Sequence, residues 1–371
     1  MSFECPVWPP EWPEIEAAAV QAIRNGHWGR YHSPLCQTLE SRLCDDFSVT
    51  AARLCCSGTA ALEIGLRVAQ IGPGDEVILA AYDFPGNFRS IELVGATPVL
   101  VDVCGPTIDR DSKLSAPVLD PSMLDSAASD RVKALVVSHL HGSIADVQSL
   151  REYCDRRGWI LMEDVCQAIG AQRDGRTLGS FGQIAMLSFG GSKLVSAGSG
   201  GALLLNDARM AARIGALVDR PGDTFPLSPL QAAVIAPQFD RLLDLNRMRA
   251  ETARFLTDHV IPNLEGWEIV AAESGSTETP AHYKYAWMAA SSEDRARVIQ
   301  AGTEIGLPMG EGFRSMSGCS ARRCRKPVET PWSDRFGERL VLLDHRALMI
   351  GSDRYQELAA AMVEVHQRSR A

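Results

Sequence analysis

The sequence predicts an α/β fold, in which a large domain with a mainly parallel sheet is followed by a smaller C-terminal α+β domain. Two observations support this prediction. Between about residues 50 and 206, short apolar runs alternate with amphipathic stretches, which is the pattern of a parallel sheet covered by helices. At 371 residues, the chain is also too long for one small core and too short for three ordinary domains.

The large domain should contain at least four buried strands with helices between them. The strands are expected at residues 76–81, 97–103, 133–138 and 159–164, and the helices at 86–95 and 145–157. In such sheets, ligands gather at the C-terminal ends of the strands. This rule points to Asp164, to His139 and to the loop after Ala81.

A long helical pattern over residues 228–258 indicates the connection to the second domain. Ser228 fits an N-cap, and Pro229 fits the first helical position. We expect a large domain of residues 1–250, which includes an N-terminal arm and this helix, and a small domain of residues 251–371. The small domain should contain strands at 285–291 and 339–344 and helices at 293–305 and 353–369.

The composition is that of a soluble globular protein, with 46% hydrophobic and 22% charged residues. No run of eighteen or more apolar residues predicts a membrane span, and the N-terminus has prolines and acids where a signal peptide would be basic and then apolar. We therefore expect a cytoplasmic protein. The net charge of −9 argues against a protein built mainly to bind nucleic acid.

A basic run and a pair of cysteines could indicate anion or metal binding, although each has a simpler explanation. The basic run at residues 322–326 fits a solvated loop, but it could also meet an anionic substrate. The ten cysteines are scattered, which indicates reduced thiols packed as small hydrophobic residues. Cys319 and Cys324 alone lie near each other in a polar segment, and two thiols without further ligands make a weak zinc site. We expect no metal.

The segment Ser-Gly-Thr-Ala-Ala-Leu at residues 57–62 comes where a strand ends and a helix begins. Free backbone N–H groups and the helix dipole make such a junction a natural phosphate site. Small residues let the phosphate approach, and the hydroxyl of Thr59 can donate to it. By itself, the same segment also fits an ordinary turn and N-cap.

Asp164 ends a strongly apolar strand, directly after Glu163. A carboxylate buried there needs a cation or strong donors. A protonated pyridine nitrogen is such a partner, and an Asp–pyridinium pair is typical of pyridoxal phosphate enzymes. The alternative is that Asp164 caps a following helix, and taken alone this alternative is favoured.

Lys193 lies in a loop of small residues after the apolar strand that ends near Ser188. Desolvation or a neighbouring cation would lower the pKa of its amine and activate it for imine chemistry. Ser188 and Ser192 could add hydroxyl groups to a phosphate site. Taken alone, Lys193 fits an exposed loop lysine equally well. Only its combination with the other two features favours imine chemistry.

In this order, the three features resemble the DegT/DnrJ/StrS family of pyridoxal-phosphate-dependent sugar aminotransferases, which includes the aminohydroxybenzoate synthases. The likeness covers most of residues 35–235 and is weak over the last hundred. It is specific for the family but not for a substrate. The matching segments are SGTAAL at 57–62, GPGDEVILAAYDF at 72–84, GATPVLVDV at 95–103, HLHG at 139–142, EDVCQAIGA at 163–171, GSFG at 179–182 and SFGGSKLVSAGSGGALL at 188–204.

The resemblance implies a role for several residues. Lys193 is similar to the Schiff-base lysine, and Asp164 to the partner of the pyridine nitrogen of pyridoxal 5′-phosphate. Gln167 matches the residue beside the ring hydroxyl, and Phe84 the aromatic ring over the pyridine face. The phosphate-binding positions match Gly58, Thr59 and Ser188. The resemblance also implies the type I aminotransferase fold with a seven-stranded sheet, and a homodimer with sites at the subunit interface.

One departure from the family pattern lies at residues 222–226. The family usually has a Gly-Tyr-Asn-Tyr-Arg stretch there, whose Asn reaches the phosphate bound to the partner subunit. This chain has Gly-Asp-Thr-Phe-Pro, so Thr224 could still donate one hydrogen bond, while Pro226 replaces the Arg. The change bears on the cross-subunit contact and on the usual sugar-nucleotide substrate.

Two histidines near the site, His139 and His141, alternate along a strand end and should point to opposite faces, which makes them poor joint metal ligands. We expect His139 to line the cofactor cleft and His141 to pack elsewhere.

The predicted function is transfer of an amino group from glutamate or glutamine to a cyclic keto substrate, such as a keto sugar or a related biosynthetic intermediate. A dehydratase of the same family is one alternative, although such members replace the lysine by histidine, so Lys193 counts against it. A non-catalytic binding or sensory protein is the other, because the stretch at 222–226 is altered. Neither nucleic acid nor membrane is an expected partner.

Overall fold

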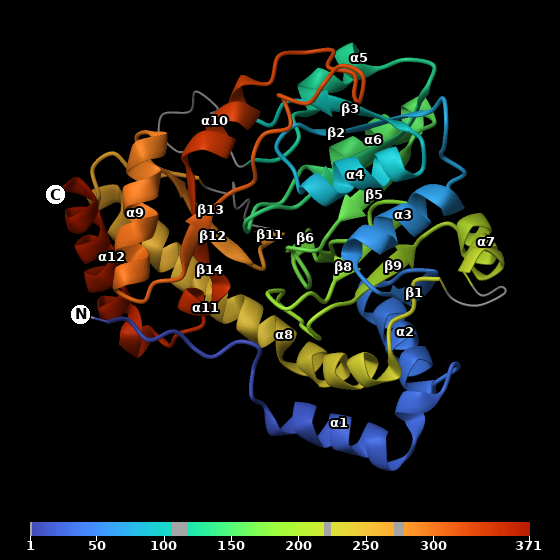
Figure 1. Ribbon diagram of the computed structural model, residues 1–371, viewed down its shortest axis with the longest axis horizontal. Coiled ribbons are helices and arrows are strands. Elements are labelled where there is room, and N and C mark those ends of the chain that lie inside the picture. The colour runs from blue at the N-terminus through green and yellow to red at the C-terminus, as the bar shows by residue number, and fades with distance from the viewer. Residues whose placement is uncertain (1, 106–116, 219–223, 271–277) are drawn as a thin grey trace.

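The computed structural model describes residues 2–105, 117–218, 224–270 and 278–371, and two residues of the altered stretch, Gly222 and Asp223, lie outside these ranges. A seven-stranded sheet forms the centre of the large domain (Figure 1). All its strands run in one direction except β9, which is antiparallel to both of its neighbours. In spatial order, the strands are β1 (Ala51–Cys55), β9 (Gly201–Leu205), β8 (Ile184–Ser188), β5 (Ile160–Asp164), β4 (Val132–Ser138), β2 (Glu76–Ala80) and β3 (Thr97–Val101).

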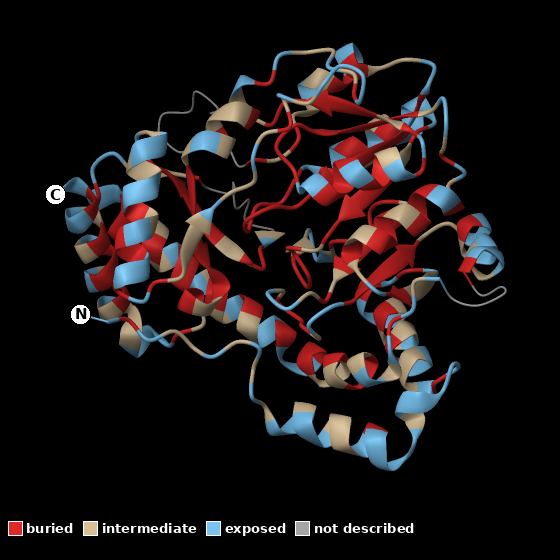
Figure 2. Ribbon diagram, in the orientation of Figure 1, coloured by how far each residue is buried: buried red, intermediate tan, exposed pale blue. Residues whose placement is uncertain are grey.

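Helices cover both faces of this sheet, because side chains alternate between two apolar cores along each strand. On β2, Ile78 packs into the core shared with α2, α6 and α8, whereas Val77 and Leu79 pack into the core shared with α3, α4 and α7. Figure 2 shows these strands almost wholly buried. The helices are α2 (Pro34–Phe47), α3 (Gly58–Val68), α4 (Pro85–Leu93), α5 (Leu124–Ala127), α6 (Val147–Arg157), α7 (Ala208–Val218) and α8 (Pro229–Phe255).

The C-terminal part forms a four-stranded antiparallel sheet with its own apolar core. Its strands are, in spatial order, β10 (Glu268–Ile269), β12 (Lys284–Met288), β14 (Leu340–Asp344) and β13 (Met309–Glu311). Its helices are α9 (Ser292–Glu304), α10 (Pro331–Arg339), α11 (His345–Leu348) and α12 (Tyr355–Arg370). A third small sheet joins the two parts through β11 (Glu278–Thr279), β6 (Gln172–Arg173) and β7 (Arg176–Thr177).

Helix α8 spans the two parts of the molecule, and α1 (Pro13–Arg24) lies along it (Figure 1). Ser228 and Gln231 form a capping box at the start of α8, and Pro229 occupies its first turn, as the sequence indicates. The predicted division at residues 250 and 251 falls inside α8, and it stays a prediction.

The predicted fold class is confirmed, and each expected strand and helix is present with its ends shifted by a few residues. The sequence did not predict that a segment of the C-terminal part packs against the large sheet. The N–H of Met316 donates to the carbonyl of Ala81 at 2.8 Å, and Arg325 exchanges backbone hydrogen bonds with Pro98 and Leu100 on β3. The segment 313–326 therefore covers the C-terminal end of β2 and the edge strand of the large sheet.

Candidate active site

Asp164 lies at the C-terminal end of β5, between the ends of β4 and β8. Its side chain is buried, and both carboxylate oxygens accept hydrogen bonds: Oδ1 from the N–H of Cys166 at 2.9 Å and Oδ2 from Nδ2 of Asn87 at 2.8 Å. Residues 165–171 form turns rather than a helix, so Asp164 is not a helix cap. Asp164 therefore lies where ligands of parallel sheets gather.

A second buried carboxyl group, that of Asp83, lies beside Asp164. Its Oδ1 accepts from the N–H of Phe84 at 2.6 Å and from Nδ2 of Asn87 at 3.3 Å, whereas its Oδ2 is buried without a hydrogen-bond partner in the described structure. Burial first, and then the charge of Asp164, raises the pKa of Asp83 to about 8. The strand-end rule points to the loop after Ala81, but no pattern in the sequence singles out Asp83 or Asn87.

The N-terminus of α3 opens beside the end of β8. The hydroxyl of Ser57 caps this eleven-residue helix by accepting from the N–H of Ala60 at 3.0 Å. A Cβ atom at Gly58 would lie 2.7 Å from Sγ of Cys166 and 3.1 Å from Cβ of Ser188, so only glycine allows this close approach. Thr59 follows in the first turn. Free N–H groups with small neighbours form a cradle suited to a phosphate.

Lys193 lies in the loop between β8 and β9, and this loop is hydrogen-bonded to helix α8. The amide of Gln238 on α8 both donates to the carbonyl of Ser196 at 2.7 Å and accepts from its N–H at 2.8 Å. The N–H of Lys193 closes a turn onto the carbonyl of Gly190 at 2.8 Å. The side chain is half-buried. The backbone of this loop is thereby held in one conformation.

The C-terminal part contributes Tyr283, which the sequence does not reveal as a site residue. Nζ of Lys193 lies 4.6 Å from the centroid of the Tyr283 ring, and so does Nζ of Lys284. The phenol oxygen of Tyr283 lies 2.9 Å from Oγ of Ser192. Tyr283 is buried and has no motif around it, so only tertiary packing brings it to the lysine.

Phe84 directly follows Asp83 in the sequence. Its side chain is 41% exposed, and its ring centroid lies 5.8 Å from that of Phe313. A Cβ atom at Gly86 would lie 2.3 Å from the Phe84 ring, so glycine at this position lets the ring lie against the start of α4. An exposed aromatic face here is available to cover a planar ligand.

Gln167 and His141 pack together, and the His141 ring centroid lies 5.5 Å from that of Phe313. Oε1 of Gln167 accepts from the N–H of His141 at 3.2 Å, and Nε2 of His141 lies 3.0 Å from the phenol oxygen of Tyr82. Burial first, and then the charges of Lys284 and Lys193, lowers the pKa of His141 to about 3. His141 is therefore neutral near physiological pH.

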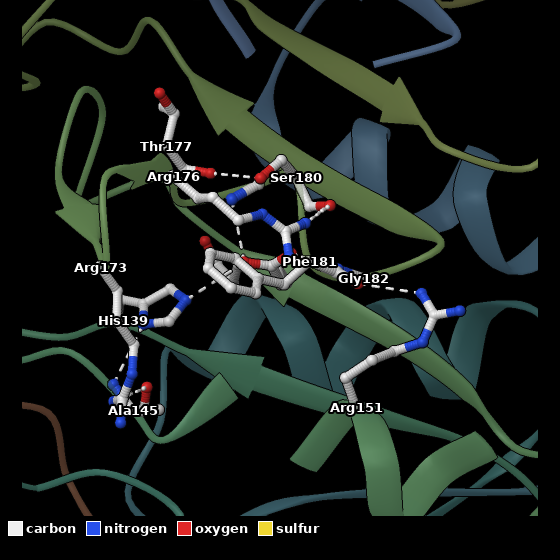
Figure 3. Close-up of polar contacts among 12 residues, drawn as sticks. His139, Ala145, Arg151, Arg173, Arg176, Thr177, Ser180, Phe181 and Gly182 are labelled. Carbon is white, nitrogen blue, oxygen red and sulfur yellow. Dashed lines mark hydrogen bonds and ion pairs between the residues drawn. The ribbon is translucent and has the colours of Figure 1, made fainter. Parts of the chain in front are cut away.

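The expected roles of the two histidines are reversed in the structure. His139 is buried with its Nδ1 accepting from the N–H of Ala145 at 3.2 Å and its Nε2 3.6 Å from Glu163, as Figure 3 shows for His139 and Ala145. His141 is the one that lies among site residues. Strand alternation fails as a guide because β4 ends at Ser138 and His141 has a positive φ of 54°.

Thr224, the predicted donor to a partner subunit, is exposed. The carbonyl of the next residue, Phe225, accepts from the N–H of Cys56 at 2.9 Å. This bond ties the described end of the altered stretch to the residue before Ser57, at the start of the phosphate cradle of the same chain.

The basic run at residues 322–326 is largely engaged within the chain. Arg323 forms a bidentate ion pair with Glu92, and the guanidinium group of Arg325 forms an ion pair with the buried Glu76. Nζ of Lys326 donates to two backbone carbonyls at 2.9 Å.

All ten cysteines are thiols rather than disulfides. No helix in the described part of the chain combines the length and apolar character that crossing a membrane requires.

Comparison with known proteins agrees with this geometry. The family model described as the DegT/DnrJ/EryC1/StrS aminotransferase family matches residues 11–362. The chain belongs to this family. It is an aminotransferase-family enzyme, and pyridoxal phosphate is the cofactor on which the family depends.

Relatives of this aminotransferase family match along almost the whole chain. The L-glutamine:2-deoxy-scyllo-inosose aminotransferase of Streptoalloteichus tenebrarius is 30% identical, over 96% of this chain and 94% of its own. The 3-amino-5-hydroxybenzoate synthase of Amycolatopsis mediterranei is 26% identical, over 97% and 98%. A crystal structure of 3-amino-5-hydroxybenzoic acid synthase superposes with a TM-score of 0.87 at 26% identity, covering 100% of both chains.

The described residues fit pyridoxal phosphate. A buried carboxylate, Asp164, suits a protonated ring nitrogen, and the N-terminus of α3 beside Gly58 suits a phosphate. Lys193 supplies an amine in a loop held in place by α8. These three groups lie around Cys166. The charges of both Asp164 and Lys193 act on its thiol, and its Sγ lies 2.7 Å from the position that a Cβ atom on Gly58 would occupy.

Proposed function

We propose that the enzyme transfers an amino group from glutamate or glutamine to a cyclic keto substrate, a keto sugar or a related biosynthetic intermediate. The observation that carries the proposal is the buried Asp164, placed at a strand end with the Lys193 loop and the α3 N-terminus around it. The names of two relatives support the substrate class, because one acts between L-glutamine and 2-deoxy-scyllo-inosose and the other makes 3-amino-5-hydroxybenzoate.

The proposed cofactor-binding residues surround the strand ends. Asp164 would hold the ring nitrogen protonated, Gln167 would lie beside the ring hydroxyl, and Phe84 would cover one face of the ring. Gly58, Thr59 and Ser188 would bind the phosphate. When bound, pyridoxal phosphate supplies an electron-withdrawing ring that stabilises negative charge on the substrate carbon.

Lys193 has two proposed roles. Its Nζ would hold the cofactor covalently between turnovers. During turnover the same amine would act as general acid and base, moving the proton between the substrate carbon that bears nitrogen and the C4′ position of the cofactor. Tyr283 and Ser192 limit the positions that the lysine loop can occupy, since the two hydroxyl groups lie 2.9 Å apart. The amine is thereby kept within reach of the site.

The enzyme is proposed to work as a homodimer in which Thr224 of one subunit donates to the phosphate in the other. A site at the edge of one sheet is open on one side, and a planar cofactor needs a further wall. The exposure of Thr224 is consistent with such a contact.

Chemical trapping tests the assignment of Lys193. Borohydride reduction of the enzyme with pyridoxal phosphate, followed by peptide mapping, should place the label on Lys193, because an imine to its amine becomes a stable secondary amine. Lys193→Ala should abolish covalent labelling and can still retain cofactor through its phosphate. The exposed Lys133 provides the matched control, since Lys133→Ala should leave labelling intact. A label on any other lysine would disprove the assignment.

A panel of amino acids tests the reaction. Glutamate or glutamine should convert the absorbance of the loaded enzyme to that of the pyridoxamine form within the first turnover. If no amino donor causes this change although the cofactor is bound at Lys193, the result contradicts the proposed transamination and favours the non-catalytic alternative.

A further inference from the structure

The ends of β2 and β5 bring two carboxyl groups into one buried cluster. Asp83 is 1% exposed and Asp164 is 5% exposed. Asn87 of α4 lies between them, with its Nδ2 2.8 Å from Oδ2 of Asp164 and 3.3 Å from Oδ1 of Asp83. A single amide group therefore links the two acids.

Hydrogen-bond donors are distributed unequally over this pair. Each oxygen of Asp164 accepts one hydrogen bond, from the N–H of Cys166 and from Asn87. On Asp83, Oδ1 accepts from the N–H of Phe84 at 2.6 Å and from Asn87 at 3.3 Å, and the nearby hydroxyl of Ser138 lowers the pKa of this carboxyl group. Its Oδ2, however, is buried with no hydrogen-bond partner in the described structure. Negative charge on a buried oxygen without a donor is costly. The geometry therefore favours a proton on Oδ2 of Asp83 and the charge on Asp164.

No ion pair in the described structure compensates two charges here, although the charge of Lys193 acts on the thiol of Cys166 beside Asp164. Within the described residues, neither Asp83 nor Asp164 forms an ion pair with a lysine or an arginine. When two carboxylates share a buried site, one of them is driven to bind a proton. Burial and the charge of Asp164 both raise the pKa of Asp83, while the adjacent Tyr82 is itself neutral, because burial raises the pKa of its phenol.

We propose that Asp83 is a positioning residue that carries the proton of this carboxyl pair, so that Asp164 alone carries the negative charge. The inference rests on the proposed function in one respect, namely that Asp164 is the partner of the cofactor's ring nitrogen. A protonated ring nitrogen would then meet one carboxylate and not two, which leaves the buried cluster close to neutral. The neutral Asp83 also holds the backbone of Phe84 through Oδ1.

Infrared spectroscopy of the full-length enzyme, freed of cofactor, tests the proposal without any turnover. With carbon-13-labelled aspartate, the enzyme should show the carbonyl stretch of an un-ionised carboxylic acid at neutral pH. This band should disappear as the pH rises through about 8, the pKa of Asp83. Asp83→Asn should remove the band. Asp102→Asn is the matched control, since Asp102 is as deeply buried but accepts hydrogen bonds from Val103, Trp332 and Ser333.

Coupling between the two acids gives the second measurement. Asp164→Asn removes the charge that raises the pKa of Asp83, so the titration midpoint of the band should fall by about one pH unit or more. A band that survives Asp83→Asn, or a midpoint that Asp164→Asn does not move, would overturn the proposal. Should Asp83→Asn fail to fold, the midpoint in Asp164→Asn decides. Because no cofactor is present, failure to trap it on Lys193 would count against the proposed function alone.

Discussion

The site is built from few charged side chains, each of which has a different local environment. Asp164 is buried and its two oxygens accept from a backbone N–H and from an amide, both neutral donors. These donors orient the carboxylate without neutralising it. A cationic ring would therefore find its negative partner already in position, which is the preorganisation that electrostatic stabilisation requires.

Asp164→Asn tests this role at the level of one residue. The amide keeps the size of the side chain but cannot hold a ring nitrogen protonated, so turnover should fall on the order of 10³-fold. Cofactor affinity should fall only about tenfold, because the phosphate contacts persist. Single-turnover rates and cofactor titrations measure the two effects. If turnover survives nearly intact, the carboxylate does no more than close the turn to Cys166. Asp102→Asn, a buried change away from the site, should leave turnover unaffected.

Candidate site residues can be proposed from the sequence where one segment carries the chemistry, and they stay predictions. Lys193 and Asp164 each follow an apolar strand in a recognisable pattern, and the structure brings their segments together. Asp83 and Tyr283 were not predictable, since nothing near either residue in sequence distinguishes it. Tyr283 meets Lys193 only because β12 packs beside the lysine loop, ninety residues away in sequence, 283 − 193 = 90. Contacts of this kind depend on tertiary packing and leave no local pattern.

At the level of elements, strand β5 serves two functions on its two faces. Asp164 faces Asn87 and the site, whereas its neighbour Glu163 faces the opposite side, as strand alternation requires. Glu163 is fully buried and accepts from the N–H groups of Gly179 and Gly182, which fixes the turn drawn in Figure 3. This turn directly precedes β8, the strand after which the Lys193 loop begins.

Glu163→Gln should destabilise this arrangement. A glutamine can accept from one of the two N–H groups, but its NH₂ group then faces the other, and one hydrogen bond to a charged acceptor is lost. The expected cost is about 1.5–3 kcal/mol. Urea unfolding of the cofactor-free enzyme measures it as a lower midpoint. The matched change Glu152→Gln, on the exposed face of α6, should leave the midpoint unchanged. Equal midpoints for the two variants would show that the backbone, and not Glu163, fixes the turn.

For the whole molecule, the sequence predicted the sheet, its helices and the linking helix α8, because apolar periodicity and caps are local features. It did not predict the segment 313–326, which leaves the small domain and covers the large sheet beside Ala81. The pairing of Arg325 with β3 uses backbone atoms, which carry no side-chain signature.

The N-terminal arm exposes Ile23, Trp28 and Tyr31, at 55%, 57% and 103%. Apolar side chains exposed in this way suit contact with a second chain.

A homodimer with shared sites is the prediction that concerns the whole assembly, and Thr224 is its most specific element. Sedimentation should give a dimer, since the open side of each site needs a wall from the neighbour. Thr224→Val keeps the shape of the side chain and removes one hydroxyl donor. Losing one hydrogen bond to a charged phosphate costs about 1.5–3 kcal/mol, so cofactor should be retained up to about a hundredfold less tightly.

The matched control for this prediction is Thr303→Val, on the exposed face of α9, which should leave cofactor retention unchanged. A monomer that binds cofactor and transaminates would refute the shared site. A dimer in which Thr224→Val has no effect has a different consequence. It would leave the dimer in place and remove only Thr224 from the phosphate contact, because a single short hydroxyl is a smaller part of that wall than the subunit that carries it.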